Sequence, residues 1–153
     1  MISRLQQIKQ LRLERAEQQL AAQQARLQQA HARQREAQQE CLDYRRWRLV
    51  EEDRLFAFCQ AEQLDRKGLK EWQQQVALLR EQEAHLEQLA AEQGEQVAKE
   101  RTRLQACQLA VHRARQQQEK FAELHRQELT TQQALRDYNE EQEQEEFRQQ
   151  IRM

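Results

Sequence analysis

The amino-acid sequence predicts an all-α fold, a long antiparallel two-helix coiled coil that forms one α-helical hairpin with one turn near residues 60–68. Three observations predict this fold. The chain has no proline and two glycines, and its 33 glutamines stand among Ala, Leu, Glu and Arg, which all favour helix. Apolar side chains recur about every 3.5 residues, as in a left-handed coiled coil. With a third of its residues charged, the chain is too polar to fill a broad globular core.

The first helix is expected over residues 2–60 of a single domain that covers residues 1–153. Alternating steps of three and four residues from Leu13 meet an apolar or aromatic side chain at ten of fourteen positions. We call this line of positions, together with the matching line in the second helix, the seam. In the first helix the seam consists of Leu13, Ala16, Leu20, Gln23, Leu27, Ala30, Gln34, Ala37, Cys41, Tyr44, Arg48, Glu51, Leu55 and Phe58.

The turn is expected at residues 61–68, because residues 59–68 (CQAEQLDRKG) lose the seam pattern. Basic residues followed by Gly68 are typical of a helix end. The second helix is then expected over residues 69–147, and twelve of its sixteen seam positions fit. They are Leu69, Trp72, Val76, Leu79, Glu83, Leu86, Ala90, Gln93, Val97, Glu100, Leu104, Cys107, Val111, Ala114, Gln118 and Phe121. Gly94 predicts a local weak point inside this helix, because a helical glycine costs about 1 kcal/mol relative to alanine.

The register of the hairpin follows from the place of the turn. Folding the chain back near residue 65 pairs positions whose numbers add to about 130, so that Phe58 meets Trp72. The same rule sets Arg48 against Glu83, two charged residues within the seam. A polar layer in a coiled coil costs stability but favours one alignment of the helices. We therefore interpret Arg48 and Glu83 as a register-setting polar pair.

Charge is unevenly distributed between the ends of the chain. Residues 1–15 carry a net charge of +3, and residues 137–153 carry −4. Positive charge at a helix start and negative charge at a helix end both oppose the helix dipole. An antiparallel hairpin that sets the two ends side by side would offset this cost. The seam weakens beyond Phe121, and the last 15 or so residues are expected to fray unless bound.

One stretch gathers the aromatic residues, LDYRRWRLVEEDRLFAF at residues 42–58. Tyr44, together with Leu55 and Phe58, falls in the seam. The others lie outside it: Leu42, Leu49 and Phe56 recur every seven residues on a neighbouring face, and Trp47 lies beside the seam. Two interpretations stay open. These side chains cover the edge of the seam or meet a second copy, or they form a docking surface for another protein.

Other classes of function find little support. His31, His85, His112 and His125 are scattered, and the three cysteines form no CxxC pair, which argues against a metal site and fits a reducing compartment. The sequence has no glycine-rich phosphate loop, and two helices offer no cleft for catalysis, a cofactor or a small-molecule ligand. The first 15 residues carry only four basic side chains, which is too few for a typical nucleic-acid-binding surface. Neither a membrane-spanning segment nor a secretory leader is indicated. We expect a non-enzymatic protein.

Five blocks of sequence, in this order and spacing, resemble the YscO family of type III secretion proteins, in its injectisome branch. The blocks are MISRLQQIKQLRLERAEQQL at 1–20, DYRRWRLVEEDRLF at 43–56, LKEWQQQVALLREQEA at 69–84, KFAEL at 120–124 and EEQEQEEF at 140–147. The resemblance implies a helical hairpin that serves as the central stalk of the export ATPase complex, similar in role to FliJ of the flagellar system. It implies a cytoplasmic place at the base of the secretion apparatus, peripheral to the inner membrane.

By this resemblance, the paired helix ends enter the hexameric ATPase ring, and the expected contacts are the basic residues Arg4, Lys9, Arg12 and Arg15. The middle of the hairpin contacts the cytoplasmic domain of the export gate, and translocator chaperones are further partners. The residues expected to bind the gate or a chaperone are Leu42, Tyr44, Trp47, Leu49 and Phe56. The alternative function is a holdase or escort that grips secretion chaperones or substrates and has no mechanical role. A third, weaker alternative is a coiled-coil spacer that dimerises.

Overall fold

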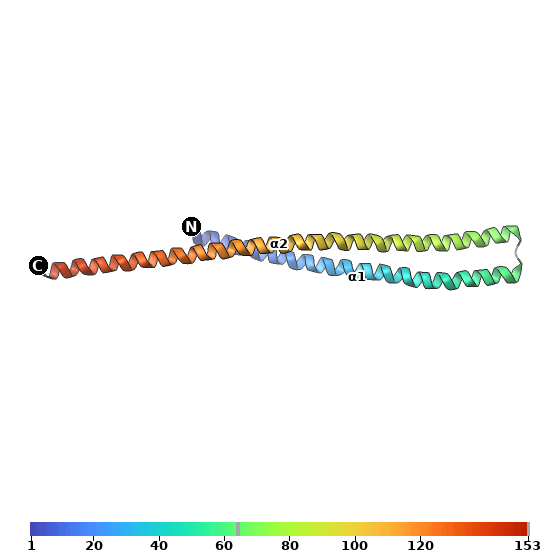
Figure 1. The fold of residues 1–153 in the computed structure, drawn as a ribbon, viewed down its shortest axis with the longest axis horizontal. Helices are drawn as coiled ribbons and strands as arrows, with labels where there is room; N and C mark the ends of the chain where they lie inside the picture. The colour runs from blue at the N-terminus through green and yellow to red at the C-terminus, as the bar shows by residue number, and fades with distance from the viewer. Residues whose placement is uncertain (64, 153) are drawn as a thin grey trace. The chain divides into compact units, whose positions relative to one another are not determined.

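A computed structural model of the protein describes residues 1–63 and 65–152, which form two helices. Helix α1 spans Ile2–Glu62 and helix α2 spans Arg66–Arg152. The helices run in opposite directions and pack against each other in a hairpin (Figure 1), which confirms the predicted fold class. They form two compact units: Ala22–Gln105, and Met1–Ala21 with Ala106–Met153. None of the described helices contains a stretch apolar enough to cross a membrane.

The turn between the helices is shorter than expected. Gln63 follows α1 with a φ of 46°, in the left-handed region that commonly ends a helix. Asp65 is the N-cap of α2. Its Oδ1 accepts a hydrogen bond from the Gly68 N–H at 2.8 Å, and its carbonyl oxygen accepts one from the Leu69 N–H at 3.0 Å. An aspartate at this position satisfies N–H groups that a helix start leaves free. The segment ending in Gly68 therefore starts the second helix, and its interpretation as a helix end was wrong.

The seam is buried or half-buried along most of its length, as the periodicity predicted. In α1 this holds from Leu13 to Leu55, and in α2 from Trp72 to Phe121. Most of its large apolar members are only half-buried, so that the fully buried apolar core is thin. The core consists of Leu13, Ala30, Cys41, Val97 and Val111.

Two predicted seam residues near the turn are exposed instead. Phe58 is 60% exposed, while the following residue, Cys59, is half-buried in its place. An α-helix has 3.6 residues per turn, so its buried line drifts by about 20° per heptad relative to a 3.5-residue repeat. The drift explains why Phe58 turns outward at the end of α1. Leu69, within the first turn of α2, is 46% exposed, while the preceding residue, Gly68, is half-buried.

Gly94 lies inside α2, which continues through it. A Cβ atom added there would lie 3.3 Å from Nε2 of Gln34 on α1. The glycine therefore leaves room for the end of a seam glutamine from the opposite helix. The helix continues without a break at Gly94, and the sequence likewise predicted no boundary there.

In the unit that contains the chain ends, the start of α1 packs against the middle of α2. The Lys9 ammonium lies 5.2 Å from the centre of the Phe121 ring, and Glu17 pairs with Arg115 at 3.6 Å. These pairs fit the predicted register. Half-buried residues reach from Ile2 on α1 to Glu128 on α2.

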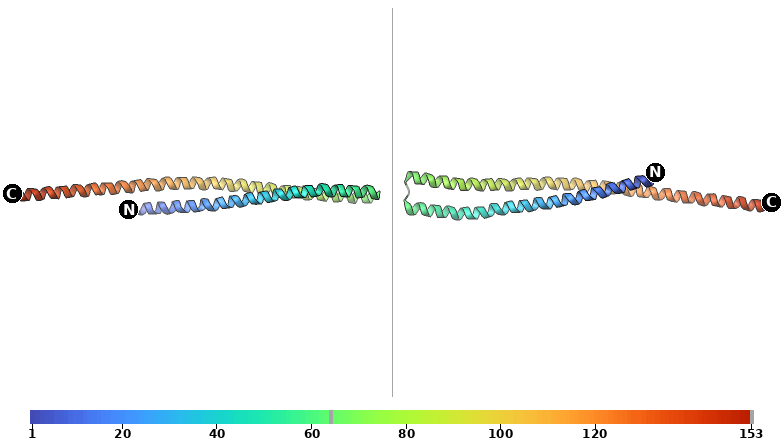
Figure 2. Two further views of the ribbon diagram at one scale, coloured as in Figure 1. Left: turned by 90° about the horizontal axis from the view of Figure 1, so that it is seen from below. Right: turned by 180° about the vertical axis from the view of Figure 1, so that it is seen from behind.

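The C-terminal part of α2 has no helix facing it. Residues 129–152 are all exposed, and both views in Figure 2 show this segment continuing past the start of α1. The expectation that the basic start and the acidic end lie side by side was wrong, because α2 has 87 residues and α1 has 61. The acidic residues from Asp137 onward lie beyond the first residue of α1. Helix α2 also ends at Arg152 and not near residue 147.

Candidate interaction site

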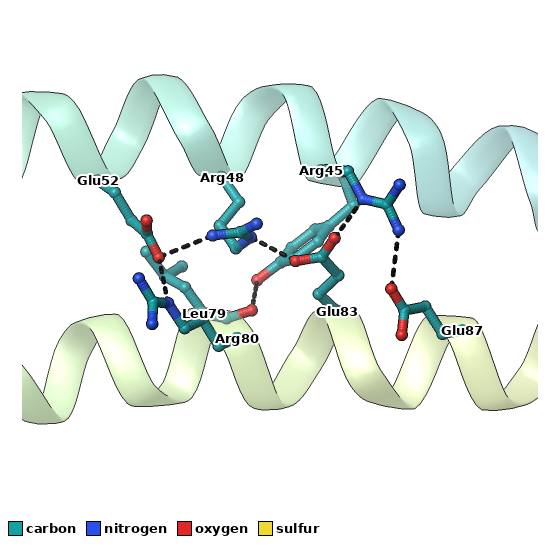
Figure 3. Close-up of polar contacts among 8 residues, drawn as sticks. Arg45, Arg48, Glu52, Leu79, Arg80, Glu83 and Glu87 are labelled. Atoms are coloured by element: carbon teal, nitrogen blue, oxygen red, sulfur yellow. Dashed lines mark hydrogen bonds and ion pairs between the residues drawn. The ribbon is translucent and has the colours of Figure 1, made fainter.

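A polar cluster interrupts the seam in the unit Ala22–Gln105, at the pair predicted to set the register. Arg48 from α1 and Glu83 from α2 form an ion pair, with side chains 13% and 10% exposed. The Nη1 of Arg48 also lies 2.9 Å from Oε1 of Glu52, which in turn accepts a bond from Nε of Arg80 at 3.0 Å (Figure 3). The structure thus brings Arg48 and Glu83 together. That they set the register stays a prediction.

Arg45 extends this cluster, although the sequence reasoning did not single it out. Its Nε donates to Oε1 of Glu83 at 2.6 Å, and its Nη2 donates to Oε1 of Glu87 at 2.8 Å (Figure 3). In heptad notation with Cys41 at position a, Arg45 occupies position e, beside the seam. Positions 45 and 87 add to 132, close to the value that aligned the seam. Applying the same register to the flanking positions would have revealed the contact.

The cluster keeps its carboxylates charged. The hydrogen bond from Arg45 lowers the pKa of Glu83 below its usual value; burial opposes this, and the nearby Arg48 adds to the lowering. The pKa of Glu52 is lowered chiefly by its hydrogen bond from Arg80, again against the effect of burial. Beside them, Tyr44 donates a hydrogen bond to the carbonyl oxygen of Leu79 at 2.8 Å, and burial raises the pKa of its hydroxyl.

A second polar layer lies further along the same unit, at Gln23 and Glu100, which are both buried. The Nε2 of Gln23 donates to the carbonyl oxygen of Glu100 at 3.1 Å and also to its carboxylate. The hydrogen bond from Gln23 is the main reason that the pKa of Glu100 is lowered. The sequence placed both residues in the seam but did not pair them. Their numbers add to 123, whereas the predicted register pairs residues whose numbers add to about 130.

The predicted partner-binding residues do not form one surface. Leu42, Leu49 and Phe56 are about half exposed and occupy heptad position b, next to the side that carries Arg45. Trp47, also half exposed, occupies position g on the other side of the seam. Tyr44 is half-buried in the seam, and its ring centre lies 5.5 Å from that of Trp47.

Phe56 is partly engaged within the hairpin, because its ring centre lies 6.1 Å from that of Trp72 on α2. This contact fits the interpretation that some of the aromatic side chains cover the edge of the seam. Leu42 and Leu49 are 45% and 51% exposed, which leaves them accessible to another protein.

The four predicted ATPase-binding residues lie near the start of α1. Arg4, Arg12 and Arg15 are exposed. Lys9 is half-buried and covers the Phe121 ring. The exposed basic surface therefore consists of three arginines, and the lysine helps to join α1 to α2.

Comparisons with known proteins agree on one family. A family model described as type III secretion protein YscO matches residues 2–150. This chain belongs to the YscO family. Yop proteins translocation protein O of Yersinia pseudotuberculosis serotype I (strain IP32953) is 47% identical over 128 residues, which are 84% of this chain and 83% of that protein. The crystal structure of type III secretion protein YscO from Vibrio parahaemolyticus matches with a TM-score of 0.90 and 39% identity, over 96% of this chain and 92% of that chain.

The family assigns this YscO chain to type III secretion, as the resemblance of its sequence blocks implied. Among residues 1–63 and 65–152, no group of three or more His, Cys, Asp or Glu side chains is arranged to hold a metal ion. The candidate site consists of the polar cluster around Glu83 and the exposed apolar and basic side chains on the two helices.

Proposed function

We propose that this YscO protein is the stalk of a type III secretion apparatus. It binds the hexameric export ATPase and the cytoplasmic domain of the export gate, promotes assembly and activity of the ATPase, and couples it to protein export. In this role it works in the cytoplasm at the inner face of the inner membrane, held there through its partners.

The observation that carries the proposal is the exposed basic start of α1. Arg4, Arg12 and Arg15 project from a helix whose seam is already closed against α2, and none of them forms an ion pair with the described residues. Their positive charge is therefore available to another protein. An acidic or carbonyl-lined surface inside an ATPase ring is a complementary partner, and such complementarity speeds and orients association.

The unpaired end of α2 supports the same role. Residues 129–152 carry five exposed large apolar side chains: Leu129, Leu135, Tyr138, Phe147 and Ile151. A helix in a protein gains most of its stability from packing against other elements. This segment has no such packing among the described residues. A partner that surrounds the segment would supply that packing.

Charge reversal tests the ATPase contact. The triple variant Arg4→Glu, Arg12→Glu, Arg15→Glu should reduce the stimulation of purified export ATPase, measured as phosphate release, by about tenfold while helicity is unchanged. A matched control reverses three basic residues near the turn, Arg66, Lys67 and Lys70, and should stimulate normally. Full stimulation by the first variant would remove the proposed ATPase contact.

We place the gate contact on Leu42 and Leu49, with Trp47, Tyr44 and Phe56 as the remaining members of the expected set. Replacing Leu42 and Leu49 by Gln should abolish binding of the purified gate domain in titration calorimetry and leave the melting temperature nearly unchanged, because both side chains are exposed. The Phe56→Gln variant should also lower the melting temperature, because it loses the contact with Trp72. A large loss of stability in the Leu42 and Leu49 variant would show that these residues belong to the core.

The exposed apolar side chains at position b also favour the second candidate, an escort that grips secretion chaperones or substrates. The two functions differ in stoichiometry. One chain per ATPase hexamer supports the stalk. Equimolar binding to a translocator chaperone, without association with the ring, supports the escort.

A further inference from the structure

The two sides of the hairpin in the unit Ala22–Gln105 differ in chemistry. At heptad position e, on one side of the seam, ion pairs join the helices: Arg45 with Glu87, and Glu52 with Arg80. At positions c and g, on the other side, no ion pair joins the helices among the described residues of this unit. We call this second side, over residues 33–50 of α1 and 78–92 of α2, the open flank.

The open flank contains a groove between the helices. Its volume is about 230 Å³, and it is lined by the apolar side chains of Ala37, Leu86 and Leu89, by the amide side chain of Gln93 and by the charged side chains of Arg33, Glu36 and Glu40. Ala37 is a seam residue, and its small side chain leaves the space that a leucine or methionine would fill. The groove therefore combines apolar side chains and one seam amide with charged side chains.

Large apolar side chains continue the same flank from the groove toward the turn. Val50 and Leu78 are 69% and 63% exposed, and Trp47 and Leu89 are also exposed. Exposed aromatic and aliphatic side chains next to a hollow are typical of surfaces that another protein covers. They come from both helices, so that one partner could contact α1 and α2 together.

The charge of the open flank is mainly negative. Four carboxylates lie on it, from Glu36, Glu40, Asp43 and Glu92, while Arg33 is the basic residue at the groove. No ion pair neutralises these carboxylates among the described residues; Asp43 and Glu92 accept hydrogen bonds from glutamine side chains. The carboxylates thus remain available to positive charge from outside.

We propose that the open flank binds a basic amphipathic helix of a partner protein. An apolar side chain of that helix enters the groove above Ala37, its apolar face covers Trp47 and Leu89, and its Lys or Arg residues lie against the carboxylates. This is recognition of a helix in a groove. The distance along α1 from Arg33 to Val50 corresponds to about 25 Å of helix, or about 17 residues of the partner. The site shares Trp47 with the set of residues expected to bind the gate, but it is separate from Leu42 and Leu49, which lie toward the other side.

A second copy of this chain fits the open flank less well. A symmetric pair of copies places the same surface patch on both sides of the interface. Such a pair centred near Glu40 would set carboxylates of the two copies against one another. Like charges in contact oppose association.

The test uses a synthetic 18-residue helical peptide of Leu and Lys as the probe, with a Leu and Glu peptide of the same pattern as its counterpart. The full-length protein should bind the Leu and Lys peptide in titration calorimetry and not bind the Leu and Glu peptide. Binding should shift the emission of Trp47 to shorter wavelength, and the shift should vanish in the Trp47→Phe variant, which still contains Trp72.

Two pairs of substitutions distinguish binding at the open flank from a general effect of the protein's net charge. Glu36→Lys with Glu40→Lys should weaken binding of the Leu and Lys peptide by about tenfold or more. Glu81→Lys with Glu95→Lys makes the same change in net charge at exposed positions of α2 outside the open flank, and should change the affinity less than about threefold. Leu89→Gln tests the groove itself and should also weaken binding about tenfold.

Three results would overturn the proposal. Equal weakening by the two pairs of substitutions would show that the peptide responds to net charge alone. Unchanged affinity in Leu89→Gln would show that the groove is not used. A stable dimer in sedimentation that is dissociated by Glu36→Lys with Glu40→Lys would show that a second copy occupies the flank.

Discussion

At the scale of single residues, we predict that the cluster around Glu83 favours one alignment of the two helices. Arg45 and Arg48 from α1 both reach the Glu83 carboxylate, and Glu52 links Arg48 to Arg80. A shift of α2 by one heptad would separate Glu83 from Arg45 and Arg48 and leave its carboxylate partly buried without these partners, while Arg48 would keep only Glu52 on its own helix. Leaving a buried charge without its partner costs more free energy than the intact pair contributes. Alignments of the helices that separate the pair are therefore less stable than the observed one.

Replacing both members of the pair tests this role. Arg48→Leu with Glu83→Leu should retain or raise the melting temperature, because an apolar pair of similar volume avoids desolvation of the charges. The register should become heterogeneous, so that the nuclear Overhauser contact between Tyr44 and Leu79 weakens or splits. A single, unchanged register would show that the apolar seam alone aligns the helices.

The same cluster predicts a dependence of stability on pH. The pKa values of Glu83 and Glu52 are lowered in the folded chain by Arg45 and Arg80, so both carboxylates stabilise the fold above the ordinary glutamate pKa of about 4.3. This contribution is lost as the pH falls through the lowered values. The melting temperature should therefore fall on acidification from pH 5 to pH 2, as followed by circular dichroism.

The variant Glu83→Gln should start from a lower melting temperature at neutral pH and show a smaller decrease in acid. A matched control is Glu81→Gln, two residues away, whose carboxylate forms no ion pair among the described residues and should leave the pH profile unchanged. Parallel profiles for the Glu83 variant and the wild type would contradict the assignment.

At the scale of helices, the start of α2 depends on Asp65. Its side chain accepts the Gly68 N–H, which would otherwise have no partner at the helix start. The Asp65→Ala variant should lose about 1 kcal/mol of unfolding free energy, measured by urea denaturation, and Asp65→Asn should lose less because asparagine also caps helices. Equal stability of the alanine variant and the wild type would show that the cap contributes nothing.

The sequence predicts features that depend on a long repeat better than features that depend on a few residues. The seam and the pairing of Arg48 with Glu83 follow from a repeat that extends over many turns, so that single exceptions do not obscure it. The turn depended on four residues, and Asp65 followed by basic residues and Gly68 fits a helix end as well as a helix start. Phe58 was misplaced because drift of the seam depends on how strongly the helices supercoil, which no single residue encodes.

The candidate surfaces were predicted less completely than the seam. The sequence identified Leu42, Leu49 and Trp47 as outside the seam, and all three are exposed. It placed Leu42 and Leu49 on a neighbouring face and Trp47 beside the seam, but it grouped all three in one candidate surface. The groove above Ala37 was missed because a small seam residue leaves a hollow only where the facing side chains fail to fill it.

At the scale of the whole molecule, the chain combines two paired helices with surfaces that have no partner among the described residues. The arginines at the start of α1, the exposed end of α2 and the apolar side chains at positions b, c and g are all free to bind other proteins. Membership of the YscO family places these surfaces within type III secretion. The stalk function that we propose, with contacts to an ATPase ring and an export gate, would use the basic and the apolar surfaces together.

The most direct test of this function is native mass spectrometry of the full-length chain mixed with its purified export ATPase and a non-hydrolysable nucleotide. The stalk predicts one chain bound to six ATPase subunits, and loss of this species in the variant Arg4→Glu, Arg12→Glu, Arg15→Glu but not in the variant reversed at Arg66, Lys67 and Lys70. Absence of any complex with the hexamer, or a complex that survives the first variant unchanged, would contradict it.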